Sequence, residues 1–205
     1  MKIVIATRNR YKAVELQTLL HGAGYDVVRL DDFDPDGKIP EVEETGTTFK
    51  ENAFLKAHAV AKATGLPSIA DDTGLEVDAL GGAPGIFSAR YAGENCTYED
   101  NVKKLLRNLS DIAEDRRTAR FKTVAVYVHK ETELSAEGVV EGLITEKEEG
   151  FGGFGYDPVF SVLYMKKTYA QLADEEKNRV SHRGKAIRSL IEKLRENGLI
   201  ADNPS

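Results

Sequence analysis

Two adjacent carboxylates, Asp71 and Asp72, follow a short and mostly apolar run at residues 66–70. The run predicts a buried strand that ends at the acids, and the Thr73-Gly74 pair after them is typical of a turn. An ionised carboxylate at the edge of a core is costly unless a metal ion, a cation or a ring of donors compensates its charge. The pair therefore indicates a charged site that binds a cation, or else an ordinary Asp-Asp-Gly turn.

A basic segment lies between the first predicted strand and the first predicted helix. It consists of Thr7, Arg8, Asn9, Arg10, Tyr11 and Lys12. Strand-to-helix turns direct backbone N–H groups and the positive end of the helix dipole toward a ligand. This turn would suit an anion, although it lacks the glycines and the Gly-Lys-Ser/Thr of a P-loop. The alternative is a capped helix start with solvated basic side chains.

Acidic residues, among them Glu43 and Glu44, precede a helix that Thr48 is expected to begin. Acids near a helix N-terminus are expected from the helix dipole alone. The functional alternative is that one of the two glutamates meets Asp72 across a metal ion. Lys56, on the same helix, would face either solvent or this site.

A glycine-rich aromatic segment at residues 151–158 includes Phe154, Gly155, Tyr156 and Asp157. Its glycines allow a close approach, and its rings offer a surface on which a base could stack, an interaction worth about 1–3 kcal/mol. The alternative is a mobile hairpin with buried aromatic side chains.

A donor-rich segment near the C-terminus contains Lys177, His182 and Arg183, and Ser181 is expected to cap the last helix. The Ser-His pair suggests a hydrolase triad, but no nucleophile elbow is present. Donors at a helix start instead suit a purine edge or a phosphate.

The elements that must position these segments alternate between strand and helix in the first half of the chain. Strands are expected at 2–7, 25–30, 66–70, 118–129, 134–145 and 158–163, and helices at 11–21, from 48, at 97–109 and from 182. Early alternation followed by a hairpin across 130–133 predicts a mixed α/β sheet. We expect a single domain over residues 1–205, with a cleft between two lobes.

Composition restricts the partners and the compartment. The chain has 205 residues, 41% hydrophobic and 30% charged, with a net charge of −6, which disfavours nucleic acid as a partner. One cysteine, Cys96, excludes an intramolecular disulfide and suits a reducing cytoplasm. No apolar stretch approaches the length of a membrane span, and the N-terminal strand-like run is too short for a signal sequence.

Five segments resemble the motifs of the inosine triphosphate pyrophosphatases, also called XTP/dITP diphosphatases or non-canonical purine NTP pyrophosphatases. They are TRNRYK at 7–12, EETGTTFKENA at 43–53, ADDTGLEVDALGGAPGIFSARYAG at 70–93, FGGFGYDPVF at 151–160 and EKNRVSHRGKA at 176–186. One such segment would be weak evidence, but five in family order across nearly the whole chain are highly specific.

The resemblance implies an ITPase-like α/β fold, in which helices flank an elongated mixed β-sheet and two lobes surround a central cleft. It also implies that water attacks the α-phosphorus of ITP, dITP or XTP, which releases a nucleoside monophosphate and pyrophosphate and removes these nucleotides from the pool. Mg²⁺ dependence and a homodimer are implied as well.

The resemblance also implies roles for individual residues. Asp72 matches the proton acceptor and metal ligand, and its partner at the metal would be Glu43 or Glu44, with Glu44 favoured. The segment from Thr7 to Lys12 would hold the triphosphate, with Asn9 and Lys12 as the matching polar positions. The base-binding positions would be Phe154, Gly155, Tyr156, Asp157, Lys177, His182 and Arg183.

Two positions depart from the family pattern. Thr73 stands where serine is common, and its hydroxyl can keep the same hydrogen bond to the substrate. Arg8 stands where glycine is common, so it either changes the geometry of the turn or adds a phosphate contact.

The first acid of the pair, Asp71, would not bind the metal itself. It would orient the groups that ligate the metal next to Asp72.

Two other functions stay open. The chain could bind or sense nucleotides with the same fold and without turnover. It could also bind single-stranded RNA with Phe151 and Phe154 as stacking platforms, which its net acidity disfavours.

Overall fold

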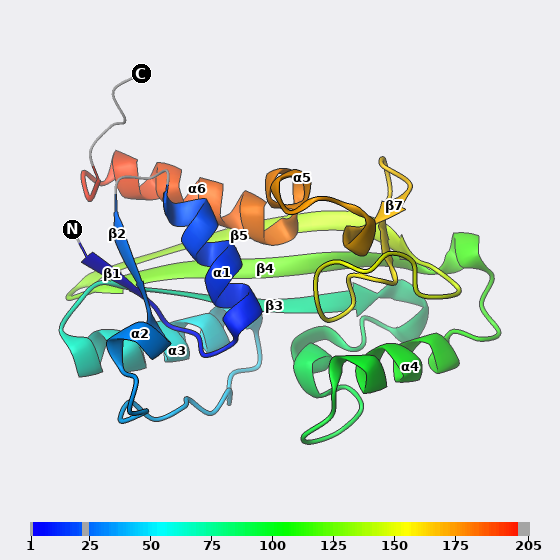
Figure 1. Cartoon of the computed structure of the whole chain (residues 1–205), viewed down its shortest axis with the longest axis horizontal. Coiled ribbons are helices and arrows are strands. Elements are labelled where there is room, and N and C mark those ends of the chain that lie inside the picture. The colour runs from blue at the N-terminus through cyan, green and yellow to red at the C-terminus, as the bar shows by residue number, and fades with distance from the viewer. Residues whose placement is uncertain (1, 22–24, 201–205) are drawn as a thin grey trace. The chain divides into compact units, whose positions relative to one another are not determined.

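The strands of this computed structural model, which describes residues 2–21 and 25–200, form one open sheet. The order of its seven strands is β2-β1-β3-β4-β5-β6-β7 (Figure 1). The strands are β1 (Lys2–Ile5), β2 (Asp26–Arg29), β3 (Ser68–Val77), β4 (Thr118–His129), β5 (Thr132–Ile144), β6 (Phe160–Val162) and β7 (Lys167–Thr168). The helices are α1 (Arg10–His21), α2 (Leu30–Phe33), α3 (Phe49–Thr64), α4 (Tyr98–Asn108), α5 (Asp174–Val180) and α6 (His182–Glu196). The predicted mixed sheet flanked by helices is confirmed.

The first strands form a parallel group around β1. Its register places Lys2 opposite Asp26 on β2, and Ile5 opposite Ile69 on β3. The chain crosses through α1 to β2 on one side of β1, and then through α3 to β3 on the other side. Right-handed crossovers to opposite sides put their helices on opposite faces of the sheet. In α/β proteins, ligands bind at the carboxyl ends of strands that lie on either side of such a switch in chain direction.

Backbone contacts divide the chain into two compact units. The first comprises the described residues of Met1–Asp72, Thr123–Gly138 and Arg183–Ser205, and the second comprises Thr73–Lys122 and Val139–His182. The core of the first unit includes Ile3, Ile5, Leu16, Leu20, Ile69, Tyr127, Ile187 and Leu190. The core of the second includes Leu75, Val77, Leu105, Phe121, Ile144, Phe160 and Tyr169. Each unit thus has its own hydrophobic core. The expectation of one functional domain over residues 1–205, with an elongated shape and a cleft between two lobes, stays a prediction.

Strand β3 continues through the paired acids instead of ending at them. The predicted strand end at residue 70 and the predicted turn at Thr73-Gly74 are therefore wrong. The side chains of Leu75 and Val77 are fully buried in the second core, so alternate burial extends the strand past Gly74.

Local signals predicted the helix starts well and the short helices poorly. Thr48 caps α3 as expected, because its hydroxyl oxygen accepts a hydrogen bond from the Glu51 amide at 3.1 Å. The Glu51 carboxylate accepts from the amide of Thr47, one residue before the cap. Helix α5 was not predicted, because its N-cap residue, Ala173, offers no side-chain acceptor. Gly22 and Gly24, which from the sequence alone would end the first helix, lie outside the described residues. No helix in the part of the chain that the structure describes has both the length and the apolar composition to cross a bilayer.

Candidate active site

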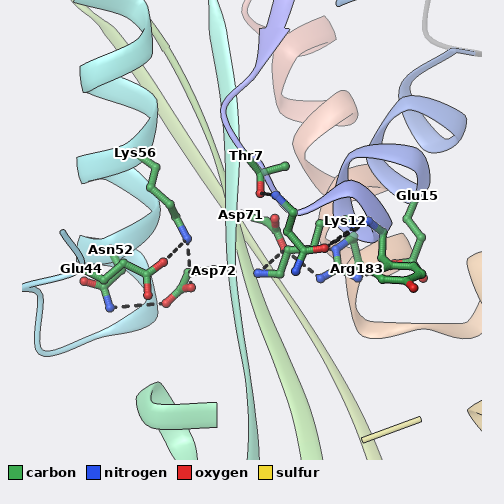
Figure 2. Close-up of polar contacts among 11 residues, drawn as sticks. Thr7, Lys12, Glu15, Glu44, Asn52, Lys56, Asp71, Asp72 and Arg183 are labelled. Atoms are coloured by element: carbon green, nitrogen blue, oxygen red, sulfur yellow. Dashed lines mark hydrogen bonds and ion pairs between the residues drawn. The ribbon is translucent and has the colours of Figure 1, made fainter. Parts of the chain in front are cut away.

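The two acids on β3 point to opposite faces of the sheet (Figure 2). Consecutive side chains on a strand alternate between faces, so the pair cannot share one ligand position. Asp71 is 1% exposed and Asp72 is 5% exposed. Each buried carboxylate therefore requires its own compensating charge, on its own face.

On one face, Asp71 is held by a buried guanidinium. Arg183 donates to Asp71 Oδ2 from Nε at 3.1 Å and lies 3.0 Å away through Nη2, while its Nη1 contacts Glu15 on α1. Burial alone would lower the pKa of Arg183, but Asp71 and Glu15 raise it above its usual value. Lys12 brings its ammonium to 3.7 Å from the same Asp71 oxygen. The result is a row of alternating charges along α1, β3 and the start of α6.

On the other face, Asp72 and Glu44 converge on one ammonium (Figure 2). Lys56 Nζ on α3 lies 2.7 Å from Glu44 Oε1 and 3.1 Å from Asp72 Oδ1. Asn52, four residues earlier on the same helix, donates to Asp72 Oδ2 at 3.5 Å. Burial lowers the pKa of Lys56, but attraction to Asp72 and Glu44 outweighs it, so this pKa lies above the ordinary lysine value.

Burial also determines how the acid and the lysine of this region titrate. It raises the pKa of Asp72, and the nearby Lys56 and Lys12 offset part of that rise. Burial lowers the pKa of Lys12, and Asp71 opposes the shift. The pKa of each group is therefore shifted toward neutral pH, compared with an exposed residue of the same type.

The turn between β1 and α1 is stabilised by its own side chains. Asn9 Oδ1 accepts from the amides of Tyr11 at 3.1 Å and Lys12 at 3.2 Å, which caps α1. Thr7 Oγ1 accepts from the Asn9 amide at 3.2 Å. Of the remaining predicted residues, Arg10 and Tyr11 are exposed, and Arg8 donates to Asp31 and Asp34.

Two carboxylates of this face could ligate a metal. Glu44 and Asp72 approach one point, occupied by the Lys56 ammonium, whereas the Glu43 side chain is exposed. Across residues 2–21 and 25–200, no set of three or more His, Cys, Asp or Glu side chains is arranged to hold a metal ion. A pair of carboxylates suits a Mg²⁺ ion whose other ligands are water and phosphate oxygens.

In the second unit, the glycine-rich segment surrounds a buried ion pair. Lys177 donates to Asp157 Oδ2 at 2.6 Å, and the same oxygen accepts from the Phe154 amide at 2.8 Å. The Lys177 ammonium lies 4.9 Å from the centre of the Phe154 ring. Gly153 has a φ of +72°, and a Cβ there would lie 2.1 Å from Asp157 Oδ2. The glycine is thus required for the carboxylate to accept both bonds.

The other predicted residues of the second unit contribute to its core. His182 stacks on Phe121 with ring centres 4.4 Å apart, and its Nδ1 lies 3.4 Å from the Tyr169 hydroxyl. Tyr156 donates its hydroxyl proton to the Ser88 carbonyl at 2.9 Å. Gly155 adopts a left-handed φ of +64°, and Thr73 directly follows Asp72 on β3.

Sequence reasoning did not assign several side chains of the charged network. Glu15 and Asn52 were not singled out, and Lys56 was left between solvent and the site. Their spacing carried a signal, because Glu15 lies three residues after Lys12 and Lys56 lies four after Asn52, so each pair shares a helix face.

The fold and these charges define an α/β protein with clustered acids and lysines near the carboxyl ends of its parallel strands. The chain belongs to the Ham1 family, whose sequence profile matches residues 3–193. A Shigella flexneri protein named dITP/XTP pyrophosphatase is 52% identical over 197 residues, which cover 95% of this chain and 98% of that protein.

Solved structures of this family have the same fold. The Staphylococcus aureus Ham1 protein matches with a TM-score of 0.83 and 43% identity, over 96% of this chain and 100% of that one. A HAM1 protein from Coxiella burnetii matches with a TM-score of 0.84 and 41% identity, over 96% of this chain and 99% of that one. The resemblance seen in the five motifs is therefore confirmed.

The buried guanidinium yields a prediction about stability. The Arg183→Met variant would leave Asp71 without its closest cation, so the free energy of unfolding should fall by about 3–5 kcal/mol. The measurement is urea unfolding of wild type and variant. Lys103→Met is the matched control, since its ion pair with Glu99 is exposed and should change stability by less than about 1 kcal/mol. Equal effects in the two variants would contradict the assignment.

Proposed function

We propose that this chain is a nucleoside triphosphate pyrophosphatase. It hydrolyses ITP, dITP and XTP to the nucleoside monophosphate and pyrophosphate, and so removes these nucleotides from the pool. One observation carries the proposal: Asp72 and Glu44 converge on a single ammonium, in a chain that is 52% identical to a protein named dITP/XTP pyrophosphatase.

Mg²⁺ is the proposed cofactor, with Asp72 and Glu44 as its protein ligands. The two carboxylates approach a point where positive charge is already stabilised, namely that of the Lys56 ammonium. The exposure of Glu43 supports Glu44 as the partner of Asp72. When bound, the ion would neutralise charge on the phosphates and lower the pKa of a coordinated water.

Asp72 is the proposed general base. It takes a proton from the water whose oxygen attacks the α-phosphorus, while the bond from that phosphorus to the bridging oxygen breaks and pyrophosphate leaves. With no ion bound, burial raises the pKa of Asp72, while Lys56 and Lys12 oppose the rise; a carboxylate beside the water is a group that can accept its proton. Lys12 stabilises the negative charge that develops on the phosphates.

Residues of the second unit are the proposed base-recognition group. The Phe154 ring provides a stacking surface, and Lys177 and His182 provide donors for the 6-oxo oxygen of the purine. Asp157 orients Lys177 through their 2.6 Å contact. A site whose donors hydrogen-bond a substrate group can discriminate against an analogue that lacks this group by about 10⁴–10⁵-fold in kcat/KM. ATP has no 6-oxo oxygen and should therefore be a poor substrate.

Arg183 has a supporting role in this proposal. Its guanidinium is engaged by Asp71 and by Glu15, so it holds the strand that presents Asp72. In the second unit, Tyr156 and Gly155 shape the aromatic segment. Thr73 directly follows Asp72 on β3.

The remaining parts of the proposal concern the protein's setting. We expect a cytoplasmic homodimer whose partner is the purine nucleotide, with neither nucleic acid nor membrane as a partner. The single cysteine and the net charge of −6 support the compartment and the lack of affinity for nucleic acid.

The test of the function is a pyrophosphate-release assay with Mg²⁺ over a panel of nucleotides. ITP, dITP and XTP should yield pyrophosphate and ATP should yield little. Release of orthophosphate alone, or equal turnover of ATP and ITP, would contradict the proposal. Binding of ITP without turnover would identify a nucleotide sensor instead.

The Asp72→Asn variant should lose far more turnover than stability. Loss of a general base should lower kcat by about 10²–10⁴-fold. The buried Lys56 loses the attraction of Asp72, which destabilises the fold, but it keeps Glu44 as a carboxylate partner, and the neutral amide no longer carries the cost of a buried charge at position 72. Asp36→Asn, at an exposed carboxylate, is the control. A near wild-type kcat in Asp72→Asn would refute the assignment.

The Lys12→Ala variant should weaken catalysis through the phosphates. Removing one charged donor should lower kcat/KM by about 10²–10³-fold. Steady-state kinetics with dITP measures this, with Lys103→Ala as a control at an exposed lysine. An unchanged kcat/KM would remove Lys12 from the phosphate site.

A further inference from the structure

The Arg8 guanidinium joins the turn after β1 to a loop that follows α2. Its Nη1 donates to Asp31 Oδ1 at 2.9 Å. Its Nη2 donates to Asp34 Oδ2 at 2.7 Å and to the Ile39 carbonyl at 2.9 Å. The Arg8 side chain is 26% exposed and that of Asp34 is 8% exposed, so the contact is largely shielded from water.

This arrangement makes Arg8 a poor phosphate ligand. Two carboxylates already neutralise its charge, and a phosphate approaching the guanidinium would also approach Asp31 and Asp34. Like charges at such distances disfavour binding. Of the two roles that the sequence suggested for Arg8, the structure therefore favours a change in the geometry of the chain over a contact with substrate.

The loop beyond Arg8 is folded around the Asp34 carboxylate. Asp34 accepts from the Lys38 amide at 2.9 Å and from the Ile39 amide at 2.8 Å. Gly37, with a φ of +66°, donates to the Asp34 carbonyl at 3.1 Å and closes the turn. Arg8 contacts both the carboxylate at the centre of this turn and the carbonyl of Ile39 at its end.

A second anchor of this part of the chain lies at residue 46. The Gly46 amide donates to Asn52 Oδ1 at 2.8 Å, and a Cβ at Gly46 would lie 2.6 Å from that oxygen. The segment 40–45 has no helix or strand, and within it the Glu44 carboxylate contacts Lys56 at 2.7 Å. Arg8 at Ile39 and Asn52 at Gly46 therefore hold the backbone on either side of that contact.

We propose that Arg8 is a positioning residue that fixes the loop presenting Glu44, and so couples the metal site to the turn at residues 7–12. The proposal rests on the proposed function, because it assigns Glu44 to the metal. Without Arg8, residues 34–45 lose the contacts at Asp34 and Ile39 that hold them to the turn after β1. Part of the free energy of Mg²⁺ binding must then be spent on ordering Glu44, which weakens the affinity for the ion.

The kinetic test separates affinity for Mg²⁺ from affinity for nucleotide. In Arg8→Ala, the Mg²⁺ concentration for half-maximal turnover of dITP should rise about tenfold, as when an outer-shell partner of a metal ligand is lost. At saturating Mg²⁺, KM and kcat should stay near wild type. A raised KM with an unchanged Mg²⁺ requirement would instead make Arg8 a phosphate ligand and overturn the proposal.

Two further variants sharpen this test. Arg29→Ala is the matched control, since it removes another Arg-Asp pair near α2, with Asp32, that touches neither Asp34 nor the loop. Its Mg²⁺ requirement should not change. Asp34→Ala should raise the requirement as Arg8→Ala does, and the double variant should be no worse than either single variant, because both break one unit. Additive effects would contradict the shared role.

Hydrogen exchange tests the loop independently of activity. In Arg8→Ala, the amides of Lys38, Ile39 and Gly46 should exchange faster than in wild type, while those of Tyr11 and Lys12 should not change. The Arg8→Lys variant, which keeps the charge but not the fork of donors, should lie between the two. Unchanged exchange at 38–46 would overturn the proposal even if the pyrophosphatase activity is confirmed. Faster exchange in a protein without that activity would refute the proposed function and leave the anchor in place.

Discussion

The structure depends on one constraint, which is that two consecutive buried carboxylates on a strand must each be neutralised on a different face of the sheet. Because side chains alternate along β3, no single cation makes a close contact with both Asp71 and Asp72 among the described residues. The protein therefore supplies cations from separate helices, with α6 and α1 on one face and α3 on the other (Figure 2). The crossovers on either side of β1 provide those helices.

The two faces differ in the cation that lies nearest to each acid. The nearest cation to Asp71 is an arginine, a fixed and permanently charged fork on a side chain that is 2% exposed, with Lys12 farther away. Asp72 meets a lysine, a compact charge on a flexible stem that can shift when another cation arrives. The contact of Asp71 is therefore the more rigid of the two.

Features that depend on neighbouring residues could be predicted, and those that depend on distant ones could not. The start of α4 was correct because Thr97 and Asp100 form a complete capping box. The hairpin of β4 and β5 was correct because its strands are adjacent in sequence. The extension of β3 was missed because burial of Leu75 depends on a core built from residues far along the chain. The contact of Arg183 with Asp71 spans 112 positions and leaves no local pattern.

That long sequence separation has a consequence for how the protein emerges during synthesis. The core of the first unit joins residues from β1 and α1 to residues of α6, which is synthesised after every other helix in residues 2–21 and 25–200. Until then, Asp71 and Glu15 carry negative charge with Arg183 still unmade, 112 and 168 positions downstream. The acids would stay hydrated, because burying them alone is unfavourable. Closure of the first unit therefore depends on α6, and a nascent chain interrupted before residue 183 cannot complete it.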